Sequence, residues 1–245
     1  MPANANIKPH QTTVNDAEIA KFAAMADEWW DLHGKFKPLH QMNPLRIAYI
    51  RDRASGIGGR GLQDLRVLDI GCGGGLLAEP LCRLGAKVTA IDAGERNVQV
   101  AKFHAEKEGL AIDYRFATAE ELAAAGEQFD CVTALEIIEH VDHVPQFLEA
   151  CAALVKPGGT LFISTLNRTA KAFGMAILGA EYLLRLLPKG THEWRKFITP
   201  AELVLAAAKQ GLVLQELKGF SYRPLSQQWR LSDDLSVNYI AAFRR

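Results

Sequence analysis

The sequence predicts one α/β domain built on a mainly parallel sheet. From Arg66 onward, short runs rich in β-branched residues alternate with segments of helical composition. This alternation is typical of a parallel sheet that helices cover on both faces. The first strand leads directly into a glycine-rich loop, as in folds that bind ligands at the carboxyl ends of their strands. A length of 245 residues with 49% hydrophobic content suits one large domain with a substantial core.

Ahead of the sheet, residues 15–60 are predicted to form a helical cover. We expect residues 1–14 to be disordered, and Asn15 or Asp16 to cap a helix that continues to Leu32. Its apolar side chains recur at helical spacing and are Ile19, Phe22, Ala23, Ala26 and Trp30. A second helix is predicted in the segment NPLRIAYIRDRA, and the flexible segment SGIGGRG follows it.

The main domain is predicted to span residues 61–245. Its strands are expected at 66–70, 87–91, 112–116, 129–135, 160–166, 212–220 and 236–243. Helices are expected in GGLLAEPLCRL and in ERNVQVAKFHAEKEG, after the first two strands. Another helix is expected to begin at Thr199 and Pro200, because a threonine cap followed by proline is a helix start signal. An unusually apolar insertion, at about residues 168–196, precedes that helix.

Charge and cysteine content exclude several classes of protein. Lys+Arg and Asp+Glu number 28 each, so the chain lacks the basic surplus typical of a nucleic-acid binder. An N-P-P-Y motif, which would favour a nucleic-acid methyltransferase, is also missing. The 4 cysteines form no C-x-x-C pair, which argues against a disulfide framework or a zinc site. With no signal-peptide core at the N-terminus, we expect a bacterial cytoplasmic protein.

The loop VLDIGCGGGLLAEPL carries the strongest chemical signal. Gly71 and Gly73 permit positive φ angles and close approach of a ligand to the backbone. Asp92 ends the next strand, where an acid is able to bind ribose hydroxyls. A dinucleotide site would need a third glycine at Leu76, and Asp69 would repel a pyrophosphate. A sulfonium cofactor has no phosphate and carries positive charge, so it fits this loop better.

The segment EIIEH follows the fourth strand at Leu135 and offers candidate catalytic groups. On a helix, Glu136, Glu139 and His140 would share one face. His140 would serve as a general base for an acceptor hydroxyl. Alternatively, the three side chains would hold a divalent cation such as Mg²⁺ that lowers the pKa of a bound hydroxyl. A third interpretation gives one Glu a role in orienting the cofactor and His140 a local packing role.

Together, the D-x-G-x-G-x-G loop and the acid at the end of the second strand resemble class I S-adenosylmethionine-dependent methyltransferases. From Glu18 onward, nearly the whole chain resembles the ubiquinone-biosynthesis O-methyltransferases more specifically. The segments that carry this resemblance are EWWDLHGKFKPLHQMNPLRIAYI, LDIGCGGGLLAEPLCRLGAKVTAID, EIIEHV, KPGGTLFISTLNRT and GTHEWRKFITPAEL. The resemblance implies a seven-stranded sheet and methyl transfer to a catechol-type hydroxyl of a polyprenylated ring.

The resemblance also implies roles for individual residues. The cofactor-binding positions that it indicates, together with Asp69 from the loop argument, are Arg46, Asp69, Gly71, Gly73, Asp92 and Leu135. Arg46 is expected to meet the methionine carboxylate, and the segment from Ala117 to Glu120 is expected near the adenine. Glu136, Glu139 and His140 match a metal-binding pattern of the family. Trp29 and Trp30 are expected either in the core or over the acceptor pocket, and His192 is a further acceptor-site candidate.

The apolar stretch AFGMAILGAEYLLRLLP, at residues 172–188, is too short between charges to span a bilayer, which takes about 20 residues. A core helix, an oligomer contact and an interfacial membrane helix remain open. Because a polyprenylated acceptor stays in the bilayer, we predict that residues 168–196 dock on an anionic membrane surface and admit the lipid tail. Basic residues on and around the stretch would meet the head groups, and these are Arg168, Lys171, Arg185, Lys189, Arg195 and Lys196.

The predicted function is O-methylation in ubiquinone biosynthesis, with S-adenosylmethionine as methyl donor. Its substrates would be 2-polyprenyl-6-hydroxyphenol and 3-demethylubiquinol, and other enzymes of that pathway are candidate partners. An O- or C-methyltransferase for another small phenol or quinone is the nearest alternative, and a membrane scaffold without turnover is a more distant one. We expect the enzyme in the bacterial cytoplasm, peripherally associated with the inner membrane.

Overall fold

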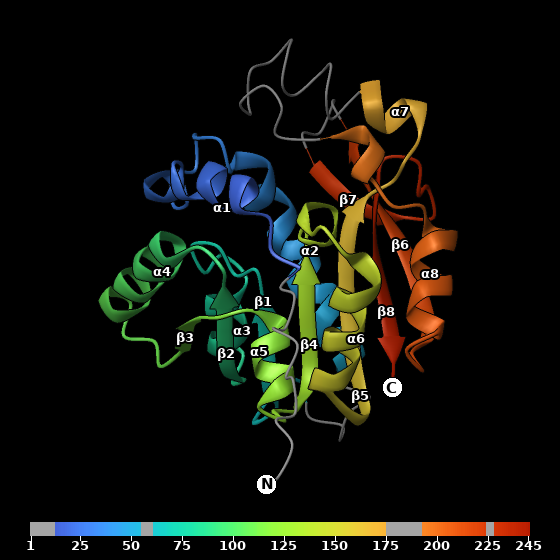
Figure 1. Cartoon of the computed structure of the whole chain (residues 1–245). Coiled ribbons are helices and arrows are strands. Elements are labelled where there is room, and N and C mark those ends of the chain that lie inside the picture. Colours follow the sequence, from blue (N-terminus) through green and yellow to red (C-terminus); the bar gives the residue numbers. More distant parts are fainter. Residues whose placement is uncertain (1–12, 55–60, 175–192, 224–227) are drawn as a thin grey trace, which may run out of the picture.

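The computed structural model describes residues 13–54, 61–174, 193–223 and 228–245. Its sheet has the order β3-β2-β1-β4-β5-β8-β6-β7 (Figure 1). Neighbours from β3 to β5 are parallel, whereas β8, β6 and β7 pair antiparallel. The strands are β1 (Arg66–Ile70), β2 (Lys87–Asp92), β3 (Asp113–Phe116), β4 (Phe129–Leu135), β5 (Val155–Leu166), β6 (Val213–Arg223), β7 (Gln228–Ser232) and β8 (Asn238–Arg244).

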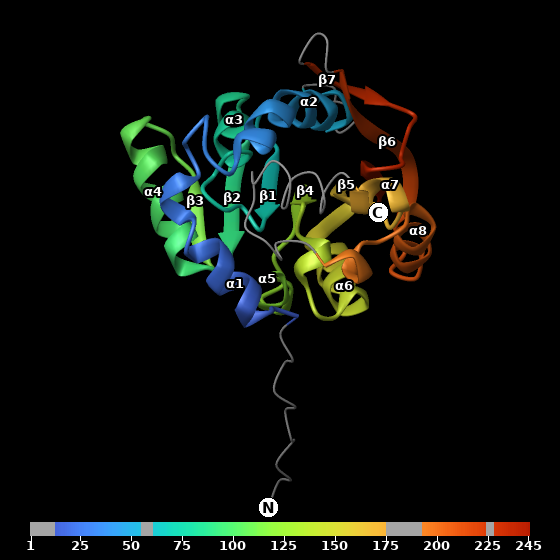
Figure 2. The same ribbon diagram turned by 90° about the horizontal axis from the view of Figure 1, so that it is seen from above.

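Helices cover both faces of the sheet, as predicted (Figure 2). One core cluster joins the sheet to α2 (Lys37–Ala54), α3 (Ala78–Arg83) and α4 (Glu95–Lys107). A second cluster joins the opposite face to α5 (Ala119–Ala124), α6 (Val144–Leu154) and α8 (Pro200–Ala208). The short helix α1 (Asp16–Ala23) lies above the carboxyl ends of the parallel strands, and α7 (Ala170–Ala172) lies near the antiparallel edge (Figure 1).

Several helix starts follow the sequence signals. Asn15 caps α1, since its side chain accepts hydrogen bonds from the backbone amides of Ala17 and Glu18. Thr199 and Glu202 form a reciprocal capping box at the start of α8, with Pro200 at the first helical position, which confirms the predicted start. Because such caps satisfy amides that have no partner within the helix, they fix where each helix begins.

The N-terminal cover differs from its prediction at three points. The first helix ends at Ala23, not at Leu32, and a 3₁₀ turn follows at Ala26–Glu28. The second helix begins at Lys37 and includes Pro44, so it starts earlier than the predicted segment. Thr13, expected to be disordered, is buried, and its carbonyl accepts a hydrogen bond from the amide of Asp142. Contacts with the sheet domain therefore override local helical spacing here.

The far edge of the sheet holds a strand that the sequence did not predict. The described residues form eight strands, where the family resemblance implied seven. The added strand, β7, pairs with β6 as a hairpin, and the indole of Trp229 donates to Oε1 of Gln41 in α2. Of the apolar insertion, residues 175–192 lie outside the described residues. Within the described part of the chain, no helix has the length and apolar character that crossing a membrane requires.

Candidate active site

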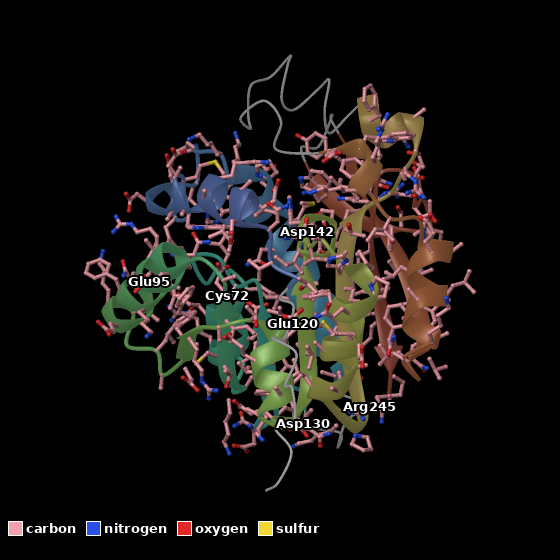
Figure 3. The ribbon with its side chains drawn as sticks, in the orientation of Figure 1. Cys72, Glu95, Glu120, Asp130, Asp142 and Arg245 are labelled. Carbon is pink, nitrogen blue, oxygen red and sulfur yellow. The ribbon has the colours of Figure 1, made fainter. Side chains whose placement is uncertain are left out.

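A cavity of about 690 Å³ opens at the carboxyl ends of the parallel strands. The loops after β1, β2 and β4 supply one side of it, and α1, α2 and the β6–β7 hairpin supply the other. Asp142, which follows the loop after β4, lies at this end of the molecule, whereas Asp130 and Arg245 lie at the opposite end (Figure 3). The lining is mostly apolar, with a small set of charged side chains, as is usual for pockets that bind small molecules.

The glycine loop has the conformation that its sequence requires. Gly71, Gly73 and Gly75 have φ angles of +70°, +53° and +90°, which side-chain-bearing residues rarely adopt. Each also lies against a neighbour. A Cβ atom at Gly71 would come 2.8 Å from the side chain of Ile137, and one at Gly73 would come 2.5 Å from the indole of Trp29. The loop therefore needs glycine for both backbone angle and space.

Both tryptophans of the N-terminal cover contact this loop. Trp29 is buried, stacks on Phe36 with ring centroids 3.7 Å apart, and lies against Gly73. The indole of Trp30 donates to the carbonyl of Gly74 at 3.0 Å and stacks on His104 of α4 with centroids 3.5 Å apart. The pair therefore attaches the cover to the glycine loop. Of the two expected roles, packing describes Trp30, which lies partly buried against a core cluster, while Trp29 belongs to that cluster and also lines the cavity.

Asp92 lies at the end of β2 and faces the cavity, as predicted. One carboxylate oxygen accepts from the amide of Gly73 at 2.9 Å, and the other accepts from the amide of Gly94 at 2.7 Å. Asn97 donates to the second oxygen at 3.1 Å and accepts from the indole of Trp29 at 3.0 Å. Burial raises the pKa of Asp92, although these hydrogen bonds oppose the rise. The acid is thus held in place by the loop, by α4 and by the cover.

Asp69 is a buried acid with an unused oxygen. Its Oδ1 accepts from the hydroxyl of Thr133 at 2.7 Å, whereas Oδ2 has no hydrogen-bond partner among the residues that the structure describes. Burial raises the pKa of Asp69 to about 7, and the negative charge of Asp92 adds to the rise while Arg46 opposes it. A buried oxygen without a partner is costly, so a cationic or donor group that reached it would be bound favourably.

Arg46 reaches the same cavity from α2. Its guanidinium is buried and donates to Oε1 of Glu136 at 2.6 Å, while its Nε has no partner in the described structure. Glu136 also accepts from the hydroxyl of Ser164 at 2.7 Å and has a φ angle of +55°. Arginine and acid therefore bridge the cover and the end of β4, and Arg46 presents a donor for an incoming carboxylate.

The other two groups of EIIEH have separate partners. Glu139 is buried and accepts from the hydroxyl of Thr165 at 2.8 Å, and burial raises its pKa. His140 contacts Oε2 of Glu18 through Nδ1 at 2.9 Å. Both side chains line the cavity.

This arrangement does not form the predicted metal site of Glu136, Glu139 and His140. Glu136 adopts a left-handed backbone angle, and only Ile138–His140 are helical, in a 3₁₀ turn. The shared-face argument assumed a continuous α-helix and therefore fails. Among the described residues, no group of three or more His, Cys, Asp or Glu side chains has the arrangement that a metal ion needs. We therefore assign these residues no metal-dependent step.

The structure brings together the remaining predicted site residues that it describes. Leu135 lies at the end of β4 in the cavity wall, and the segment from Ala117 to Glu120 lines the cavity beyond Asp92. His192 lies outside the described residues. Asn97, Glu18 and Trp229 also line or support the site, yet sequence reasoning missed them. Asn97 is five residues beyond Asp92 in the first turn of a helix, a spacing that carries no general signal.

A methionine-derived sulfonium cofactor fits these residues. Gly71 and Gly73 line the cavity, and the buried oxygen of Asp69 that has no partner among the described residues suits the cofactor's positive charge. Arg46 has an unused donor for the α-carboxylate of the cofactor, and Asp92 is an acceptor for ribose hydroxyls. A pyrophosphate fits this part of the cavity poorly, because Asp69 and Asp92 would repel it.

The sheet order, the glycine loop after β1 and the acid ending β2 define a class I methyltransferase fold. A family model described as a methyltransferase domain matches residues 39–217. The structure is similar to magnesium protoporphyrin IX methyltransferase from Synechocystis, with a TM-score of 0.66 and 20% identity, over 94% of this chain and 100% of that one. It is also similar to the N-methyltransferase NodS from Bradyrhizobium japonicum, with a TM-score of 0.61 and 16% identity, over 94% of this chain and 99% of that one.

Curated relatives narrow the family further. The ubiquinone biosynthesis O-methyltransferase of Dinoroseobacter shibae is 58% identical, over 94% of this chain and 96% of the relative. The enzyme of that name from Parvibaculum lavamentivorans is 54% identical, over 97% of this chain and 96% of the relative. The chain therefore belongs to the ubiquinone biosynthesis O-methyltransferase family, which confirms the resemblance seen in the sequence.

Proposed function

We propose that this chain methylates a catechol-type hydroxyl of a polyprenylated ring, using S-adenosylmethionine as methyl donor. The substrates we infer are 2-polyprenyl-6-hydroxyphenol and 3-demethylubiquinol. Family membership supports the reaction, and the names of the relatives support the pathway. One observation about the site carries the proposal: a single cavity joins Asp69 and Asp92 to His140 and continues along an apolar wall.

The residues divide this cavity into a cofactor end and an acceptor end. Asp69, Gly71 and Asp92 lie at the cofactor end, with Arg46 beside them. When bound, the cofactor supplies an electrophilic methyl group, and its transfer leaves S-adenosylhomocysteine. His140 lies toward the acceptor end, where it takes the proton of the hydroxyl so that the oxygen reacts as a phenolate. The largely apolar lining disfavours water near this step.

The apolar wall supports an acceptor with a hydrocarbon tail. Phe22 of α1, Met42 of α2, Leu166 at the end of β5 and Trp229 of the hairpin all line the cavity beyond the catalytic groups. A plain catechol would leave this surface uncovered, whereas a prenylated ring would bury part of it. Burial of apolar surface contributes roughly 25 cal/mol per Å², so the tail should lower KM markedly.

A transfer assay tests the proposal. Purified protein receives methyl-labelled S-adenosylmethionine and either a short-chain prenylated demethylubiquinol, kept reduced, or catechol without a tail. We expect labelling of the prenylated acceptor and little labelling of catechol. Equal labelling of both would contradict lipid specificity, and labelling of neither, with cofactor binding intact, would contradict the assigned acceptor. The variant His140→Gln should retain cofactor binding and lose most of the transfer.

We further propose that residues 168–196 dock the enzyme on an anionic membrane surface. The apolar composition of residues 172–188 supports this, as do Phe173 and Trp194, exposed aromatic side chains with ring centroids 6.3 Å apart. The basic residues expected at the head groups are partly engaged elsewhere: Arg168 pairs with Glu202, and Lys171 pairs with Asp234. Docking then depends more on apolar side chains than the sequence indicated.

Vesicle binding tests the docking proposal. We expect the wild-type protein to sediment with vesicles that contain anionic lipid, and a variant that lacks residues 172–187 to lose this binding while retaining affinity for S-adenosylhomocysteine. The matched control is Phe103→Ser, which removes an exposed aromatic side chain from α4, away from α7 (Figure 1). Unchanged vesicle binding by the folded deletion variant would overturn the proposal.

A further inference from the structure

Two residues of the N-terminal cover contact the imidazole of His140. Oε2 of Glu18 lies 2.9 Å from Nδ1, and both side chains are largely buried, with exposed fractions of 17% and 10%. The ring of Phe22 meets the imidazole edge-on, with centroids 5.2 Å apart and an interplanar angle of 86°. Glu18 and Phe22 are four residues apart in α1, so they project from the same face of the helix. Two side chains on one face of α1 therefore contact the imidazole ring of His140.

Further bonds fix α1 to the loop that carries His140. The amide of Asp142 donates to the carbonyl of Thr13 at 2.9 Å, and the side-chain amide of Asn15 donates to Oδ1 of Asp142 at 2.8 Å. Asn15 is also the cap of α1. These bonds attach the start of α1 to Asp142, which follows His140 by two residues and is labelled in Figure 3. This anchoring sets the position from which Glu18 reaches the imidazole.

Glu18 is held as a carboxylate. Burial would raise its pKa, but hydrogen bonds from His140 and from Lys21 lower the pKa to about 2. Nζ of Lys21 lies 2.7 Å from Oε1, so the second oxygen of the carboxylate is the one that meets the imidazole. An ionised carboxylate only accepts hydrogen bonds, and the Nδ1 atom of His140 must therefore carry the hydrogen.

A fixed hydrogen on Nδ1 determines what the other nitrogen does. In the neutral ring, Nε2 then carries the lone pair and is the atom able to accept a proton. When Nε2 has taken the proton, the ring is positive and the adjacent carboxylate stabilises it. Carboxylate-oriented histidines act as general bases in this way in other enzymes.

We propose that Glu18 is a positioning residue that holds His140 with Nδ1 protonated and Nε2 ready to accept the proton of the acceptor hydroxyl. The inference rests on the proposed function, because it assigns His140 the role of general base. The proton of the hydroxyl passes to Nε2 and leaves to water after the methyl group has been transferred. The cover is then part of the catalytic machinery, and a chain without α1 would bind cofactor yet turn over slowly.

The kinetic test compares three variants with the wild-type enzyme. Glu18→Ala removes the acceptor, and we expect kcat to fall by roughly 10- to 100-fold, within the range that general bases contribute, with KM changed by less than about twofold. Glu18→Gln keeps an acceptor oxygen but loses the charge, so we expect a smaller fall in kcat. Asp16→Asn is the matched control, since Asp16 is an exposed acid in the same helix, and it should retain full activity.

A spectroscopic readout separates positioning from mere folding. Long-range ¹H–¹⁵N spectra of histidine-labelled protein, with His140 assigned through His140→Gln, report which ring nitrogen carries hydrogen. We expect the Nδ1–H form in the wild type and in Glu18→Gln, and a shift toward Nε2–H in Glu18→Ala. Unchanged kcat in Glu18→Ala, or an unchanged tautomer there, would overturn the proposal. An inactive wild type would contradict the proposed function instead, while the spectra would still test the Glu18–His140 contact.

Discussion

The indole ring of Trp29 lies so close to Gly73 that a Cβ atom at residue 73 would come within 2.5 Å of it. Trp29 belongs to the N-terminal cover and Gly73 to the glycine loop, and the two residues are 44 positions apart in the sequence. The protein's own side chain therefore requires glycine at this position. Gly73 also has a φ angle of +53°, so an added side chain would meet two separate penalties.

These two penalties are separable by mutation. Gly73→Ala should destabilise the protein by clearly more than Gly109→Ala, because Gly109 has a φ angle of +67° but no atom near its Cβ position. Backbone strain alone should cost about 1–2 kcal/mol. In a Trp29→Ala background, Gly73→Ala should cost no more than Gly109→Ala does. Chemical denaturation of the wild type, the two single variants Gly73→Ala and Trp29→Ala, and the double variant measures the coupling, with Gly109→Ala as the reference. Additive effects would show that the indole does not constrain the loop.

Arg46 is expected to bind the amino-acid part of the cofactor. Arg46→Met should weaken binding of S-adenosylhomocysteine by about 10- to 100-fold, the effect of losing a hydrogen bond to a charged group. Binding of 5′-methylthioadenosine, which lacks the carboxylate, should change little. Calorimetric titration with both ligands decides between a direct contact and a general loss of structure. Arg53→Met, on the same helix and paired with Glu216, is the matched control and should affect neither ligand.

Much of the sheet and the cofactor end of the site was predictable, because local sequence determines them. The predicted strand 129–135 matches β4, since a mostly apolar run rich in β-branched residues suits a strand buried on both faces. Asp92 was identified because the acid ends its strand and the strands are parallel. The short edge strand β7 was missed, because QWRLS is only 5 residues long and is stabilised by pairing with β6.

The acceptor end was less predictable, because contacts distant in sequence decide it. Helical spacing placed Trp30 in a continuing helix, but its bond to the carbonyl of Gly74 and its stacking on His104 favour a different course of the chain. The pairing of Arg46 with Glu136 joins residues 90 positions apart. Nothing in either segment alone indicates that partner, so the separation of Glu136 from His140 was not foreseeable.

Asn97 links Asp92, the acid expected to bind ribose, to the cover, and two variants test its two bonds independently. Asn97→Asp keeps an acceptor for the Trp29 indole but places a second carboxylate about 3.1 Å from Oδ1 of Asp92. Affinity for S-adenosylhomocysteine should fall by about tenfold. Trp29→Phe leaves Asp92 untouched and removes the indole donor. This variant should lose about 1 kcal/mol of stability, and its affinity for S-adenosylhomocysteine should fall less than that of Asn97→Asp. Trp229→Phe is the control, because its indole bonds to Gln41 at the hairpin. If Trp29→Phe weakened binding of S-adenosylhomocysteine more than Asn97→Asp did, the roles assigned to the two bonds of Asn97 would be wrong.

Asp69 should make the cofactor-free protein less stable as pH rises. Burial raises its pKa from 3.8 to about 7, so between these values the folded protein holds a proton that the unfolded chain has released. The contribution of Asp69 to stability is therefore greatest below about pH 4, declines by on the order of 1 kcal/mol per pH unit, and levels off above about pH 7. Asp69→Asn, which still accepts from Thr133, should reduce this slope. Some slope should persist, because burial raises the pKa of Glu139 in the same direction.

Denaturant unfolding from pH 4 to 8 measures this slope, and Asp130 supplies a control of opposite sign. Asp130 is partly buried, but hydrogen bonds from Lys156 and from the Arg66 amide lower its pKa. Its carboxylate therefore stabilises the fold at pH values above the ordinary pKa of an aspartate. Asp130→Asn should therefore destabilise the protein at pH 7, where Asp69→Asn stabilises it. The same Asp69→Asn variant should bind S-adenosylhomocysteine more weakly at pH 8, because the cationic amino group loses its anion. If Asp69→Asn kept the wild-type slope, the raised pKa of the buried carboxyl would be refuted.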